Sequence, residues 1–137
     1  MRHLYRCPLR WADMDAYGHV NNAVFLRYLE EARIDFLSPP DRRFRQGSVV
    51  ARHEIDYKRQ LVHRREPVDI ELWVTQIRAA SFTITSEVKD ADHLYVRAST
   101  VVVPFDFETQ RPRRIVDEER DFLEKYQDDA QEEAVAA

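Results

Sequence analysis

The spacing of apolar residues changes once along this chain of 137 residues, and that change limits the folds open to it. Before the pair Pro39–Pro40, apolar side chains recur at helical spacing, at Phe25, Leu29, Ala32 and Phe36. After Gly47 the apolar positions alternate, which is typical of strands. The alternation predicts strands over residues 49–58, 68–75, 81–88 and 94–103. One long helix is therefore followed by a run of strands.

Two further segments complete the predicted fold. Residues 3–13 mix apolar and polar positions and predict a first strand, and residues from Asp117 onward predict a peripheral helix. Because one helix cannot cover both faces of such a sheet, the sheet is expected to curl around it. We therefore expect an α+β fold, a curved antiparallel sheet of about five strands around one long central helix, plus a C-terminal helix. Residues 1–116 form the main domain in this interpretation, and residues 117–137 an acidic helix and tail.

Composition and charge exclude several classes of protein. Hydrophobic residues make up 44% of the chain, enough for a core. No uninterrupted apolar run is long enough to span a membrane and no signal peptide is evident, so we expect a cytoplasmic protein without a membrane partner. Cys7 is the only cysteine and the five histidines are scattered, so we expect neither a disulfide nor a bound metal.

The net charge of −4 conceals an uneven distribution. From Asp117 to the end there are nine acidic and two basic residues, so the remainder of the chain is mildly cationic. Its arginines form three small groups, at Arg42/Arg43/Arg45, Arg64/Arg65 and Arg111/Arg113/Arg114. Short groups suit a small polyphosphate ligand better than a nucleic-acid groove, so no nucleic-acid partner is expected. Ordinary solvated loop arginines remain the alternative.

Polar residues are concentrated immediately before the predicted helix, in the run WADMDAYGHVNNAVFLRYLEE from Trp11 to Glu31. Gly18 permits a tight turn, and Asn21 or Asn22 can cap the helix. A turn and a cap would account for all of these residues. The same arrangement also suits acyl transfer, because a helix N-terminus can polarise a carbonyl oxygen while a carboxylate on the preceding turn faces the carbonyl carbon.

Other catalytic motifs are missing from the sequence. There is no G-x-S-x-G nucleophile elbow, and with two glycines in the chain no glycine-rich phosphate loop can exist. The run instead resembles the signature D-x-D-x-x-G-H-V-N-N of the hotdog-fold acyl-CoA thioesterases, the 4-hydroxybenzoyl-CoA thioesterase-like family. The resemblance covers roughly residues 3–107. The matching positions are Asp13, Asp15, Gly18, His19, Val20, Asn21, Asn22, Tyr28, Glu31 and Arg33.

The resemblance implies hydrolysis of acyl-CoA thioesters to a free acid and CoA, without a cofactor. Asp15 would act as nucleophile or as general base on a water molecule. The backbone amide that meets the thioester oxygen would fall at about Asn22, His19 would lie beside the carboxylate, and Asp13 would be structural. Two alternatives stay open. They are a hotdog-fold protein that binds acyl-CoA or a partner without turnover, and a thioesterase for acyl groups on a carrier protein.

The resemblance also implies a homodimer or homotetramer with active sites at the subunit boundaries and CoA lying along them. Arg78 is the first candidate for a phosphate contact and Arg64 and Arg65 the second, although Ala79-Ala80 lacks the glycine or basic residue of many relatives, which predicts modest nucleotide affinity. The remaining candidate substrate-binding residues are Tyr17, Gly18, Asn21, Phe25, Tyr28, Tyr57, Leu61, Ser81 and Phe82. Their aromatic character permits aryl or medium-to-long aliphatic acyl groups.

Overall fold

The computed structural model describes residues 1–38 and 47–128 and confirms the α+β class. Its elements are β1 (His3–Cys7), the short 3-10 helix η1 (Trp11–Asp13), α1 (Asn22–Leu37), β2 (Ser48–Tyr57), β3 (Val68–Ile77), β4 (Phe82–Lys89), β5 (Leu94–Asp106), β6 (Arg111–Pro112) and α2 (Asp117–Lys125). The strands form one antiparallel sheet in the order β1-β3-β4-β5-β2, and β6 pairs with β5.

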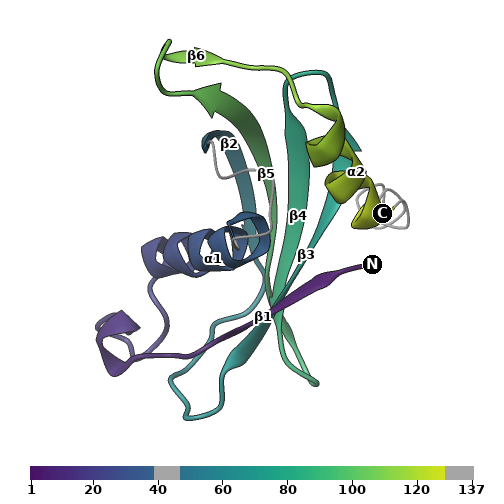
Figure 1. Ribbon diagram of the computed structural model, residues 1–137. Coiled ribbons are helices and arrows are strands. Elements are labelled where there is room, and N and C mark those ends of the chain that lie inside the picture. Colours follow the sequence, from purple (N-terminus) through teal and green to yellow (C-terminus); the bar gives the residue numbers. More distant parts are fainter. Residues whose placement is uncertain (39–46, 129–137) are drawn as a thin grey trace.

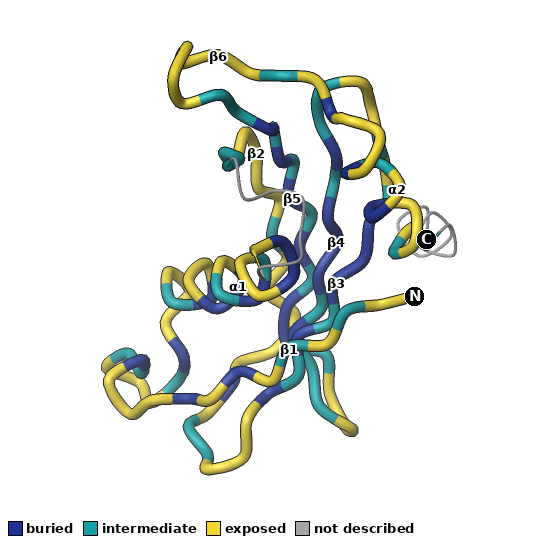
Figure 2. Tube along the Cα trace, viewed as in Figure 1, coloured by how far each residue is buried: buried dark blue, intermediate teal, exposed yellow. Residues whose placement is uncertain are grey.

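The helix α1 packs on one side of the curved sheet (Figure 1). Its buried residues follow the predicted helical spacing and are Phe25, Tyr28, Leu29, Ala32, Phe36 and Leu37. They share one core cluster with the alternate buried residues of the strands, which include Ile70, Leu72, Ile84 and Val96. Figure 2 shows this core as dark segments along β3, β4 and one flank of α1. Apolar residues on both faces of the 94–103 segment indicated either a central strand or a subunit contact, and β5 is an inner strand between β4 and β2.

Several predicted boundaries are wrong, each for a local reason. β1 ends at Cys7 rather than near residue 13, since Pro8 has no N–H to donate to the neighbouring strand and the chain then turns into η1. β5 continues through Pro104 to Asp106, where the sequence predicted an end at residue 103. The sixth strand β6 was not predicted, because two residues that include a proline carry no strand pattern.

A β-bulge corrects the predicted faces of β2. The simple alternation placed Val49 on the same face as His53. The pairing register with β5 shifts between Val50 and Arg52, so that Ala51 is an additional residue in β2. Val50 and His53 therefore lie opposite buried residues of β5, while Val49 lies on the other face.

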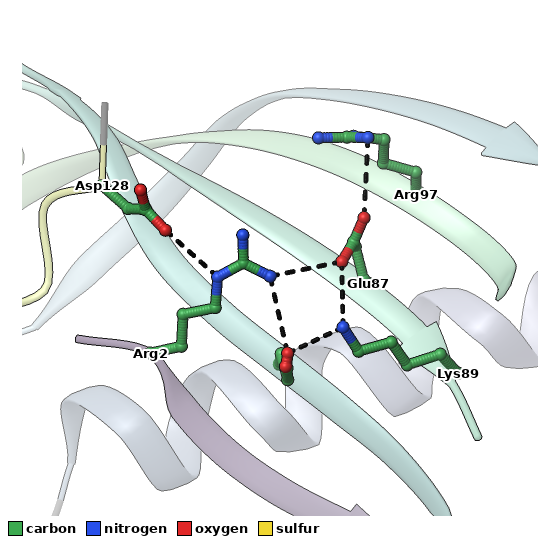
Figure 3. A network of polar contacts seen from close by, with 6 residues as sticks. Arg2, Glu87, Lys89, Arg97 and Asp128 are labelled. Carbon is green, nitrogen blue, oxygen red and sulfur yellow. Dashed lines mark hydrogen bonds and ion pairs between the residues drawn. The ribbon is translucent and has the colours of Figure 1, made fainter. Parts of the chain in front are cut away.

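Charged residues cover the sheet face that is turned away from α1, as Figure 3 shows. The guanidinium of Arg2 lies 3.7 Å from the ring centroid of Trp73 and donates to Asp128 at 3.1 Å. The ammonium of Lys89 lies 2.7 Å from the carboxylate of Glu71. Glu87 and Arg97 extend the same network. These ion pairs cover part of this sheet face.

The C-terminal helix α2 is joined to the rest of the fold by a buried ion pair and by backbone pairing. The two oxygens of Glu119 accept hydrogen bonds from Arg113, both of 2.8 Å, and one of them also accepts from the Val116 N–H at 3.0 Å. After α2, Tyr126 and Asp128 bond the backbone of Val74 at 2.9 and 3.0 Å. The chain thereby adds to the edge of β3 beyond the end of β1.

Some predictions concern residues outside the described ranges. They are the helix-terminating prolines Pro39 and Pro40, the arginine group Arg42/Arg43/Arg45, and the end of the acidic tail from residue 129 onward. Within the described ranges, neither helix is long and apolar enough to cross a membrane.

We predict that Glu119→Gln lowers the free energy of unfolding by about 3 kcal/mol, because it leaves the half-buried Arg113 guanidinium without its countercharge. Urea denaturation measures this difference. Glu124→Gln, an exposed substitution on the same helix, is the control and should change stability by less than about 0.5 kcal/mol. Equal effects of the two substitutions would contradict the structural role of the pair.

Cys7 is fully buried, and burial raises the pKa of its thiol to about 12. Because the thiolate is the reactive form, we predict that the native protein reacts with disulfide reagents at pH 8 only as it unfolds. The rate of thiol modification with and without urea measures this. Rapid modification of one equivalent in the native protein would show that the pocket around Cys7 opens readily.

Candidate active site

The first aspartate of the D-x-D pair holds the polar turn against α1. Its carboxylate is buried and accepts hydrogen bonds from the Tyr28 hydroxyl at 2.6 Å and the Arg10 N–H at 3.1 Å. Its backbone carbonyl accepts from the Asn21 N–H at 3.0 Å. Burial, together with the neighbouring Asp13, raises the pKa of Tyr28 above its usual range, so that hydroxyl remains a donor. The predicted structural role of Asp13 is confirmed.

The second aspartate has one oxygen fixed and one oxygen available. Oδ1 of Asp15 accepts from the backbone N–H groups of Tyr17 at 2.8 Å and His19 at 3.1 Å. The Asp15 N–H donates to the His19 carbonyl at 2.7 Å, which closes the turn around Gly18, whose φ is +80°. Among the described residues, Oδ2 has no hydrogen-bond partner. The orientation of the carboxylate is thus set by backbone donors rather than by another side chain.

The amino end of α1 leaves one backbone donor free. Asn21 is the cap, since its side chain accepts from the Ala23 N–H at 2.8 Å. The Val24 and Phe25 N–H groups reach the Asn21 carbonyl at 2.9 and 3.3 Å. Within residues 1–38 and 47–128, the Asn22 N–H finds no acceptor. Of the two predicted cap residues, Asn21 therefore has that role, and Asn22 supplies the unpaired donor.

The available carboxylate and the end of α1 meet in one cavity of about 250 Å³. The cavity is lined by Asp15, His19, Val20, Asn22, Phe25, Tyr57, Lys58, Arg59 and Gln60. The Tyr57 hydroxyl donates to the Asn22 carbonyl at 3.1 Å, so the end of β2 is held beside the start of α1. Five residues named from the sequence are therefore brought together, namely Asp15, His19, Asn22, Phe25 and Tyr57.

Four other predicted substrate-binding residues do not line this cavity. Tyr17 is 84% exposed on the turn beside Asp15. Leu61, Tyr28 and Phe82 are buried in the core, and the Leu61 carbonyl accepts from the Val20 N–H at 2.8 Å. Of these, Leu61 is tied to the site through Val20, and Tyr28 through Phe25, whose ring centroid lies 5.9 Å from its own, whereas Phe82 lies at the β3–β4 end of the sheet, opposite Val102.

The predicted phosphate contacts are spread over the molecule. Arg64 is engaged within the fold, because its guanidinium bonds the Asp90 carboxylate at 2.5 Å and the carbonyls of two neighbouring residues. The Tyr95 hydroxyl and Arg64 hold the pKa of Asp90 well below its usual range. Arg65 is exposed. Arg78 and Ser81 belong to the β3–β4 connection, which lies at the end of the sheet away from the start of α1 (Figure 1).

Sequence reasoning gave no site role to four of the cavity residues, Val20, Lys58, Arg59 and Gln60, although Val20 belongs to the signature run. For the last three, the available signal was Tyr57. It is a candidate site residue at the end of a predicted strand, so the residues that follow it must lie near the same cavity. For a metal, the described ranges contain no group of three histidine, cysteine or carboxylate side chains placed to hold one.

Comparisons with known proteins identify the family of this chain and similar solved structures. The family model of the thioesterase-like superfamily matches residues 9–125. A structure described as a predicted thioesterase from Bacillus stearothermophilus is 25% identical, with 93% of this chain and 97% of that chain covered and a TM-score of 0.84. The YbaW probable thioesterase from Escherichia coli is 27% identical, with 93% and 99% covered and a TM-score of 0.76.

A third structure, a thioesterase from Thermus thermophilus complexed with coenzyme A and Zn, is 30% identical. The match covers 90% of this chain and 92% of that chain, with a TM-score of 0.77. A comparison with curated protein sequences gives no match. Because the family model spans most of the chain, including the cavity, this protein belongs to the thioesterase-like superfamily.

Proposed function

We propose that this protein hydrolyses acyl-CoA thioesters to a free acid and CoA in the cavity between Asp15 and the start of α1. The observation that carries the proposal is the pairing, in one cavity, of a carboxylate whose orientation is fixed by two backbone donors and a helix amide without an acceptor among the described residues. Membership of the thioesterase-like superfamily supports thioester hydrolysis, and a similar protein was solved with coenzyme A.

In this proposal, the oxygen and the carbon of the thioester carbonyl meet different groups of the site. The thioester carbonyl oxygen accepts from the Asn22 N–H, where the positive end of the α1 dipole stabilises the oxyanion as it forms. Oδ2 of Asp15 then either takes a proton from a water that attacks the carbonyl carbon or attacks that carbon itself. The tetrahedral intermediate expels the CoA thiolate, which takes up a proton. In the nucleophilic route this leaves a mixed anhydride of the acyl group and Asp15, which water then hydrolyses to the free acid and the regenerated carboxylate. In both routes one water molecule is consumed for each thioester cleaved.

Two further groups complete this site. The His19 N–H holds Oδ1 of Asp15, and the His19 side chain lines the same cavity, where it can orient the attacking water. Phe25 and Tyr57 form an aromatic wall, with ring centroids 6.0 Å apart. A wall of this kind suits the apolar part of an acyl group.

We also propose that the active unit is a homodimer or a tetramer built from it. Within the described residues, β2 has a neighbour on one side only, and its edge carries exposed apolar side chains such as Val50. The adjacent flank of α1 exposes Leu26 and Ile34. Pairing β2 with a second copy would cover both. Arg78 and Ser81 lie away from the cavity of their own chain, so they would contact CoA held by the other subunit.

Asp15→Asn is predicted to lower kcat by roughly 10² to 10⁴, because the amide keeps the backbone contacts and loses the base or nucleophile. The rate of thiol release from a panel of acyl-CoA esters measures this. Asp121→Asn, an exposed substitution on α2, is the control and should keep the parental rate. A folded Asp15→Asn protein with undiminished activity would refute the assignment.

Val50→Asp is predicted to shift the protein toward the monomer, since it places a charge on an edge strand that would otherwise pair with a second copy. Light scattering coupled to size-exclusion chromatography measures the mass against 16.3 kDa for one chain. Val116→Asp introduces the same charge at an exposed position outside the sheet and serves as the control. A parental protein that is monomeric at every concentration tested would contradict the proposed assembly.

A further inference from the structure

The cavity is lined by two cationic side chains that have no role in the proposed reaction. They are Lys58 and Arg59, which follow the last residue of β2. Their backbone N–H groups both donate to the Tyr95 carbonyl, at 2.8 and 3.2 Å. Immediately before them, the Tyr57 hydroxyl is bonded to the first residue of α1. The backbone that carries both cations is therefore fixed on two sides, although the side chains themselves are exposed at the rim.

Neither cation has a carboxylate partner within the described ranges. Other cations on the sheet and its connections do, because Arg64 pairs with Asp90, Arg97 with Glu87 and Lys89 with Glu71. Even the exposed Arg52 on β2 has Glu54 at 3.9 Å. The two cations beside the cavity thus remain available to a ligand.

The charges of the cavity favour an anionic ligand. Asp15 contributes one negative charge, and Lys58 and Arg59 contribute two positive charges, so the lining is net positive with His19 neutral. A cation pair beside an active-site carboxylate attracts anions to the rim and leaves the carboxylate free for chemistry. Arginine in addition offers a planar fork of donors that matches a carboxylate or phosphate.

We propose that Lys58 and Arg59 form a subsite for an anionic group of the thioester substrate. This inference rests on the proposed hydrolysis of acyl-CoA. The pantetheine arm next to the sulfur is uncharged, so the anion comes either from a carboxylate on the acyl group or from a phosphate at the other end of the arm. Both present oxygen anions to the same pair of side chains. The two residues position the substrate and take no part in bond making or breaking.

The test compares four thioesters with the double variant Lys58→Gln/Arg59→Gln. Two acyl groups of the same length are used, one that ends in a carboxylate and one that does not. Each is attached to CoA and, separately, to pantetheine, which lacks phosphates. For substrates that bear the recognised anion, we expect kcat/KM to fall roughly tenfold through KM, with kcat unchanged. Added salt should reduce the difference between parent and variant, because the side chains are exposed.

The pattern of losses identifies the anion. A loss confined to the carboxylated acyl groups assigns the subsite to the acyl end, and a loss confined to the CoA esters assigns it to phosphate. Arg6→Gln/Lys125→Gln removes two exposed charges outside the cavity and outside the proposed β2 contact, and is the matched control. Equal kcat/KM values for parent and variant with all four substrates, or an equal loss in the control, would overturn the proposal.

Binding measurements separate this inference from the proposed reaction. If the parental protein hydrolysed none of the four thioesters, the proposed function would fail. Calorimetric titration with CoA and with each carboxylated thioester would then test whether Lys58 and Arg59 bind an anion, independently of hydrolysis. A roughly tenfold weaker Kd for one of these ligands in the double variant, and not in the control, would retain the subsite. Unchanged Kd values, or no binding to the parental protein, would overturn it.

Discussion

The hydrogen bond between Asp13 and Tyr28 is the contact on which the site depends. It joins a carboxylate on the polar turn to a hydroxyl two turns into α1, with both groups buried. A hydrogen bond to a charged group contributes about 1.5–3 kcal/mol, and leaving a buried carboxylate without it costs at least as much. Since Asn21 also donates to the Asp13 carbonyl, the turn cannot move relative to the helix without breaking several bonds at once.

This anchoring explains why the motif contains two aspartates. The buried Asp13 carboxylate bonds Arg10 and Tyr28 through Oδ2 and serves the fold, whereas Asp15 uses Oδ1 on the turn and lines the cavity with Oδ2 unbonded among the described residues. A carboxylate held by backbone donors loses little freedom when a substrate binds, and fixed geometry of this kind lowers the barrier to attack. The helix amide at Asn22 is fixed in the same way, because it belongs to the backbone of a packed helix.

Local patterns predicted much of this arrangement, whereas contacts between distant residues were not visible. The helical spacing of α1 and the turn-forming residues around Gly18 are local patterns, so both could be recognised in the sequence. The resemblance placed Asp15 and Asn22 in roles that stay proposals here. Arg64 was named as a candidate phosphate contact because its ion pair with Asp90, 26 residues away in the chain, is not visible in the sequence. The two rim cations were missed for a related reason: they directly follow Tyr57, and the position of Tyr57 beside α1 depends on its hydrogen bond to the distant Asn22 and on the pairing of β2 with β5.

The same strand links assembly to the reaction. β2 is an edge of the sheet along its length and a wall of the cavity at its last residue, Tyr57. The Tyr57 hydroxyl joins that edge to α1 through its hydrogen bond to the Asn22 carbonyl. The N–H of the same residue, Asn22, is the donor that would stabilise the oxyanion. In the proposed dimer, a second copy paired along β2 would therefore fix the wall, the rim cations and the helix end together. A lone edge strand has fewer restraints and opens more readily, so in the proposed dimer the geometry of the cavity would depend on the pairing as well as on the chain itself.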